Sequence, residues 1–270
     1  NSTVQSFNSV ATIIGPGSVT FNRNTIGTND IDRWNFIGGT TTWEATGMTG
    51  NDQFASNSTQ SLVGRSGWGG GTLIFNTGAA ARSQQLNSNI YLLGGASVAN
   101  PRASTTLTLG SATAVLDRRS GSSLSFIEDG TMNLTAVGLS AVDGDFLGAW
   151  TTYGTTASGI TDWTARQGTG GGVQAFAGYT ADAFGTGVHT NLTGSATLGG
   201  SDLAATLRIA AAADLTIGSG NTLTLEQGGL LIPATNAGPV NILDGSITSE
   251  WASGSNDLML YNYGTGVTTL

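Results

Sequence analysis

Paired carboxylates are the residues in this chain whose spacing first suggests chemistry. Asp143-Gly144-Asp145 is the closest pair, and Glu128-Asp129 is another. Two carboxylates on one face can act as acid and base in glycoside hydrolysis, and Ca²⁺ prefers oxygen ligands. Asp-Gly is also a common turn sequence, and neither EF-hand spacing nor a tandem calcium-binding nonapeptide is present. We therefore expect solvated turn carboxylates and no cofactor, with Asp143 and Asp145 kept as the candidate Ca²⁺ ligands.

The single histidine, His189, is the only imidazole that could serve a catalytic triad or a zinc site. Ser195 lies nearby in sequence, but no Gly-x-Ser-x-Gly elbow surrounds any serine. The chain has no cysteine, which makes a zinc site improbable and gives no disulfide. We expect His189 to be a loop or ladder residue, and we predict no catalytic residues and no enzymatic activity.

Aromatic side chains offer a second kind of site. An exposed tryptophan ring can stack on a pyranose face, and Trp150 and Trp163 are the candidates for glycan binding among six tryptophans. Tryptophan also buries a large apolar area, so the alternative is that these rings pack the interior or an interface. The sequence favours that structural role.

Short strands must position these residues. Two apolar residues flank a polar one in triplets that return every eight residues: Leu207-Arg208-Ile209, Leu215-Thr216-Ile217 and Leu223-Thr224-Leu225. Leu230-Leu231-Ile232 follows, and turn residues separate the triplets. Period two is the pattern of half-buried strands. Three such strands per turn predict coils of roughly 22 to 26 residues, within the range of solenoid repeats.

The fold class predicted is all-β, a right-handed parallel β-helix spanning 1–270 as a single solenoid segment. Irregular insertions are expected at about 22–85, which is rich in glycine, and at 141–190, where the beat breaks. A β-sandwich or jelly roll is the alternative, because alternation alone does not separate parallel from antiparallel pairing. Both ends have strand-like patterns, so the segment is expected to belong to a longer chain.

Composition narrows the partners. The net charge is −8, the nine basic residues are all arginine, and charged residues make up only 10% of the chain. Nucleic acid and anionic lipid both need a basic footprint, so neither is an expected partner. No apolar run approaches the length of a membrane-spanning helix, so no membrane insertion by this segment is expected.

Residues 104–270 carry a resemblance to a known family. The motifs are Phe146-Leu147-Gly148-Ala149-Trp150, Thr161-Asp162-Trp163-Thr164, Gly172-Val173-Gln174-Ala175 and Tyr179-Thr180, followed by the triplets from Leu207 onward. This arrangement resembles bacterial autotransporter-type passenger proteins with autotransporter-associated β-strand repeats, including planctomycete-like secreted β-solenoids. The resemblance implies a right-handed parallel β-helix, export to the cell surface and a role in adhesion or extracellular structure. It implies no catalytic residue.

The function predicted is therefore structural. A solenoid end exposes unpaired main-chain groups unless a cap covers them, and neither end of this sequence has a polar amphipathic cap. We expect an extracellular or cell-surface protein that stacks end to end with copies of itself as a fibre, filament or adhesin stalk. The alternative is a glycan-binding or polysaccharide-degrading β-helix, with surface glycans as partners.

Overall fold

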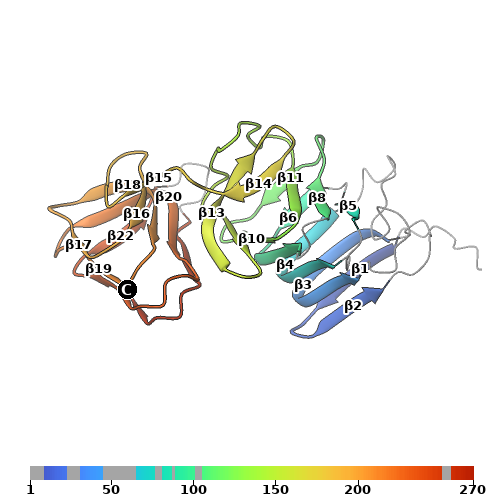
Figure 1. Ribbon diagram of the computed structural model, residues 1–270, viewed down its shortest axis with the longest axis horizontal. Coiled ribbons are helices and arrows are strands. Elements are labelled where there is room, and N and C mark those ends of the chain that lie inside the picture. Colours follow the sequence, from blue (N-terminus) through green and yellow to red (C-terminus); the bar gives the residue numbers. More distant parts are fainter. Residues whose placement is uncertain are drawn as a thin grey trace, which may run out of the picture. The chain divides into compact units, whose positions relative to one another are not determined.

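The computed structural model describes residues 9–22, 31–44, 65–76, 81–86, 89–100, 105–250 and 257–270. Over these ranges the chain is all-β and contains no helix, which confirms the predicted class (Figure 1). Correspondingly, no helix among the described residues is long and apolar enough to cross a membrane. The chain divides into two compact units. Unit 1 comprises 1–145 and 166–174, and unit 2 comprises 146–165 and 175–270.

Unit 1 consists of short strands and two long ones, which run in chain order through the blue and green part of Figure 1. They are β1 (Ser9–Ile14), β2 (Ser18–Asn22), β3 (Ile31–Glu44), β4 (Arg65–Asn76), β5 (Ser83–Leu86), β6 (Asn89–Leu92), β7 (Gly95–Asn100), β8 (Thr106–Gly110), β9 (Leu116–Arg118), β10 (Ser123–Glu128), β11 (Thr131–Thr135) and β14 (Gly172–Ala175).

Successive strands of unit 1 pair in parallel and place like residues above like. One row joins Val19, Thr41, Leu73, Val98 and Phe126 across β2, β3, β4, β7 and β10. The last four members are at most 1% exposed, so this row is part of the core. On another face, β5, β8 and β11 pair in parallel, with Gln84 beside Leu107 at a separation of 23 residues. The predicted spacing therefore describes real neighbours.

Glycines form the corners within each coil of unit 1. Gly39 and Gly71 have φ of 68° and 103°, in the left-handed region that favours glycine. A Cβ on Gly71 would lie 2.8 Å from the main chain of Gly38, so neighbouring corners stack too closely for a side chain. The prediction of an irregular insertion over 22–85 is wrong for its described residues, because 31–44 and 65–76 are regular strands bent at glycine corners.

Unit 2 contains the remaining strands, coloured from yellow to red in Figure 1. They are β12 (Thr151–Thr155), β13 (Gly159–Gln167, whose last two residues belong to unit 1), β15 (Tyr179–Ala181), β16 (His189–Leu192), β17 (Ala196–Thr197), β18 (Asp202–Ile209), β19 (Ala213–Thr216), β20 (Thr222–Ile232), β21 (Val240–Leu243), β22 (Ser246–Ser249), β23 (Met259–Asn262) and β24 (Thr268–Thr269).

Parallel pairing also builds the core of unit 2. One sheet has the order β15-β16-β18-β20-β22, with β23 beside β20, and a second has the order β17-β19-β21-β24. Leu207 pairs with Leu230, 23 residues further on, and Leu230 pairs with Leu260. Leu207, Leu215, Leu223 and Leu230 all belong to one buried cluster. The four predicted triplets are thus strands with a shared core.

The predicted excursion at 141–190 departs from the parallel pattern. Its strands β12 and β13 form an antiparallel hairpin, with Thr152 opposite Trp163. Gly229 of β20 lies directly beneath this hairpin, since a Cβ there would be 2.5 Å from Ala149 and 2.9 Å from the Trp163 ring. The outer face of the β16-β18-β20 sheet is therefore covered by aromatic side chains, while its inner face packs on leucines.

Candidate functional site

The two candidate Ca²⁺ ligands lie in an exposed turn of unit 1. Asp143 and Gly144 occupy the turn itself, and Gly144 has φ of 81°. One Asp143 oxygen accepts hydrogen bonds from the Gly168 N–H (2.7 Å) and from Gln174 Nε2 (3.2 Å), and an Asp145 oxygen accepts one from the Ser140 hydroxyl. No group of three His, Cys, Asp or Glu residues gathers within the described ranges. The carboxylates hold neighbouring loops together, and calcium binding stays a prediction.

Arg166 lies beside this turn and was not a candidate from sequence. Its side chain is 2% exposed, and every hydrogen bond it donates ends on a main-chain carbonyl. Nε donates to Ser140 (2.7 Å), while Nη1 donates to Leu134 (2.6 Å) and Gly171 (2.7 Å). Burial lowers the pKa of the Arg166 guanidinium, but the group stays charged because its ordinary value is so high. Arg166 therefore fixes three separate segments at the end of unit 1.

The same segments cover the edge of the last coil in unit 1. Asn133 of β11 pairs in antiparallel fashion with Gly172 of β14, and the Leu134 N–H donates to the Gly171 carbonyl (2.8 Å). β14 thus occupies the side of β11 that β8 does not. An antiparallel strand of this kind ends a parallel ladder, because its side chains and amides do not repeat the register below.

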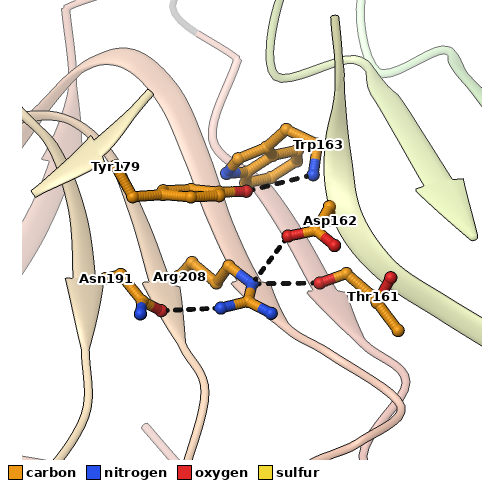
Figure 2. A network of polar contacts seen from close by, with 6 residues as sticks. All are labelled: Thr161, Asp162, Trp163, Tyr179, Asn191 and Arg208. Carbon is orange, nitrogen blue, oxygen red and sulfur yellow. Dashed lines mark hydrogen bonds and ion pairs between the residues drawn. The ribbon is translucent and has the colours of Figure 1, made fainter. Parts of the chain in front are cut away.

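A polar network in unit 2 joins the hairpin to the sheet (Figure 2). Arg208 Nε donates to the Thr161 carbonyl (3.0 Å) and lies 3.2 Å from an Asp162 oxygen, and Nη1 donates to Asn191 (2.8 Å). The guanidinium carbon also lies 5.3 Å from the centre of the Tyr179 ring. The side chains of Arg208 and Asp162 are only 14% and 18% exposed, so the ion pair is shielded from solvent.

Tyr179 completes the network and has little capacity for proton transfer. Its hydroxyl accepts a hydrogen bond from the Trp163 N–H at 3.3 Å. Burial, and then the negative charge of Asp162, raise the pKa of the Tyr179 phenol, which stays protonated at every physiological pH. Every polar group in Figure 2 is bonded within unit 2, so the arrangement attaches the hairpin to the sheet.

His189 is a ladder residue of β16, as one of the two predicted roles required. It pairs with Tyr179 and Thr206, and its Nδ1 lies 3.0 Å from the Thr206 hydroxyl. The Phe146 and Phe176 rings lie 4.7 and 4.6 Å away, centre to centre. Burial lowers the pKa of the His189 imidazole to about 4, so it is neutral at pH 7. Ser195 instead accepts a hydrogen bond from the Asp214 N–H.

The candidate glycan-stacking rings are buried. Trp150 is 5% exposed and Trp163 is 0% exposed. Trp163 contacts Tyr261 and Phe146 edge to face, at 5.5 and 6.3 Å between ring centres. A sugar cannot stack on either tryptophan in this conformation, which favours the packing role that the sequence also favoured. Of the other tryptophans, Trp43 is buried at 0%, and Trp251 lies outside the described residues.

The exposed apolar residues at the ends of the two ladders were missed from sequence. Val19, in the first coil of unit 1, is 40% exposed although the next residue of its row, Thr41, is 1% exposed. Leu260, in the last coil of unit 2, is 48% exposed although Leu230 beside it is 2% exposed. Each core row therefore ends on a residue with no further rung above it in the described structure.

Comparison with protein-family models, curated proteins and solved structures gives no match for this chain. Its function is therefore argued from the geometry above.

Proposed function

We propose that this chain is a right-handed parallel β-helix segment of a secreted or cell-surface bacterial protein, and that its role is structural. The coils would stack end to end with other copies to form a fibre, filament or adhesin stalk. Parallel pairs at separations such as Gln84–Leu107 and Leu207–Leu230, both 23 residues, support the solenoid. The resemblance to autotransporter-type passenger repeats agrees with the same fold and location.

The observation that carries the proposal is the pair of exposed terminal residues, Val19 and Leu260. In a ladder that ends in solvent, a terminal residue is normally polar or covered, since an exposed edge invites pairing with another chain. Burying half of an aliphatic side chain contributes about 1 kcal/mol, and each terminal coil offers several such rungs along with main-chain donors and acceptors.

Mechanical strength would follow from the ladder itself. Parallel hydrogen bonds run along the stacking direction, and leucine rows such as Leu207–Leu230 continue through the interior. The polar networks around Arg166 and Arg208 lie within single units and attach loops and the hairpin to the coils. These charged groups are already bonded to protein atoms, which supports a structural role for them rather than contact with a substrate.

Negative-stain electron microscopy of the purified chain across a concentration series tests this proposal. Filaments or rods that lengthen with concentration are expected at neutral pH. The variant Leu260→Arg places a charge on the exposed rung and should shorten or abolish them. Val137→Arg is the matched control, because Val137 is 62% exposed in a turn of unit 1 and should leave assembly unchanged. Discrete particles at every concentration would contradict the proposal.

A further inference from the structure

Stacking of copies leaves open which ends meet, and the two terminal coils differ enough to decide it. We infer that the contact is head to tail: the first coil of unit 1 (β1 and β2) receives the last coil of unit 2 (β22, β23 and β24) of a second copy. This inference rests on the proposed function and adds the polarity of the assembly.

The tail presents rows that are ready to continue. β22 and β23 extend the two halves of β20, pairing Leu223 with Ile247 and Leu230 with Leu260. Between these halves β20 turns at Gly228, whose φ is 72°. β22, β23 and β24 each pair with one described strand only, so each has a second side toward which the sheet can grow.

The head has a matching cross-section. β1 and β2 are two short strands separated by a corner at Gly15, whose φ is 102°, and both pair in parallel with β3. Val19 of β2 begins the row that is buried from Thr41 onward. A head thus offers two strands joined at a glycine corner, as the tail does. Docking the two in parallel extends both ladders without a change of register type.

Charge argues against the tail-to-tail alternative. The strands and turns of the tail carry Asp244, Glu250 and Asp257 and include no basic residue over 233–250 and 257–270. Two tails in contact would therefore bring six carboxylates together without a counter-charge, which is unfavourable at a sheet edge. Residues 9–22 of the head carry no ionisable side chain, so a head meets a tail without repulsion.

The other end of unit 1 does not compete for the tail. There the edge of β11 is already paired with β14, and Arg166 fixes both segments through the carbonyls of Leu134 and Gly171. A head-to-tail contact uses a different surface on each partner, so it propagates from copy to copy and does not stop at a dimer. This is the geometry that a filament needs.

Two blocked variants test the polarity by complementation. Val19→Arg blocks the head and leaves the tail intact, whereas Leu260→Arg blocks the tail and leaves the head intact. By light scattering after gel filtration, each variant alone should be a monomer of about 27.2 kDa. An equimolar mixture should form dimers of twice that mass and no larger species. Both substitutions replace exposed side chains, and circular dichroism checks that each variant is folded.

The other outcomes separate this inference from the proposed function. If Val19→Arg alone still dimerises and Leu260→Arg does not, the tails pair with each other and the polarity is overturned while stacking survives. The reverse result means that heads pair. If wild-type chain never associates, both proposals fail. The absence of cysteine allows a second readout: Val19→Cys mixed with Leu260→Cys should give mainly the mixed disulfide, at least several-fold above a Val137→Cys control.

Discussion

The last coil of unit 1 and the last coil of unit 2 are built alike but end differently. In unit 1 the edge of β11 is covered by an antiparallel strand, β14, and a buried arginine fixes the covering segment to it. In unit 2, β23 ends the Leu207–Leu230–Leu260 row with a residue that is 48% exposed. Closing a ladder thus takes a returning strand whose carbonyls have donors, and unit 2 lacks one among its described residues.

The comparison also separates two kinds of buried arginine. Arg166 faces only carbonyl oxygens and serves the closed end of unit 1, whereas Arg208 is paired with Asp162 and attaches the hairpin of unit 2 to its sheet. The former satisfies orphan acceptors of loops, and the latter holds two layers of one unit together. Neither arginine reaches the exposed rung at Leu260, so the open end depends on apolar and main-chain contacts.

The largest expected effect contrasts an interior rung with the open one. Leu230→Ala should lower the free energy of unfolding of unit 2 by about 2–5 kcal/mol, because it leaves a cavity in a fully packed row. Leu260→Ala is the matched control in the same row and should cost well under about 1 kcal/mol in the isolated monomer. Urea denaturation followed by circular dichroism measures both. Equal losses would mean that Leu260 is buried in solution and that the end is not open.

A second contrast breaks the closed end of unit 1. Arg166→Met removes three charge-assisted hydrogen bonds and leaves buried carbonyls unpaired, so we expect a loss of about 2–3 kcal/mol in the same assay. Arg119→Met is the control, since Arg119 is 64% exposed in its ion pair with Asp117 and should contribute no more than about 0.5 kcal/mol. A loss for Arg166→Met no larger than the control would remove Arg166 from the account of the closed end.

Glycine corners sharpen the difference between interior and first coils. Gly71→Ala puts a Cβ 2.8 Å from the Gly38 main chain at φ of 103°, and should cost about 1–2 kcal/mol from backbone strain alone. Gly17→Ala, in the first coil, meets nothing within 4 Å and should be close to neutral. Thermal unfolding of the two variants compares them. A destabilised Gly17→Ala monomer would indicate that something covers the head.

The smallest effect distinguishes the units by pH. The folded pKa of His189, about 4, lies below its ordinary value of 6.5, so the neutral ring contributes stability above pH 6.5. That contribution should decline as the pH falls from about 6.5 through 4. The difference in melting temperature between wild type and His189→Gln should therefore narrow over this range. A constant difference would show that His189 is not buried against Phe146 and Phe176.

Sequence reasoning predicted the strands of unit 2 well because leucine triplets with period two have few other interpretations. It did not say that alternate triplets fall on different sheets, so that Leu207 stacks on Leu230 and not on Leu215. It took the glycines near residues 38 and 70 as signs of irregular chain. In the structure they recur as stacked corners, and a search for glycine pairs at coil spacing, such as Gly70-Gly71 and Gly94-Gly95, would have detected them.

The polar sites were harder to predict for a physical reason. Asp162 and Arg208 meet only because the hairpin folds back over the sheet, and no local pattern encodes that contact. Arg166 has only carbonyl partners, which every residue possesses, so its sequence neighbourhood contains no signal at all. The exposure of Val19 and Leu260 depends on their position at the ends of rows, although their residue types are those of the interior.

Amide hydrogen exchange as a function of protein concentration tests the central claim most directly, because it reads the closed and open ends in one sample. The account predicts that the amides of β1, β2, β23 and β24 become more protected as the concentration rises. The amides of β11 and β14 should keep the same protection throughout, since their edge is already paired. Protection of β23 and β24 that does not depend on concentration would contradict the claim that this end of unit 2 is open to another copy.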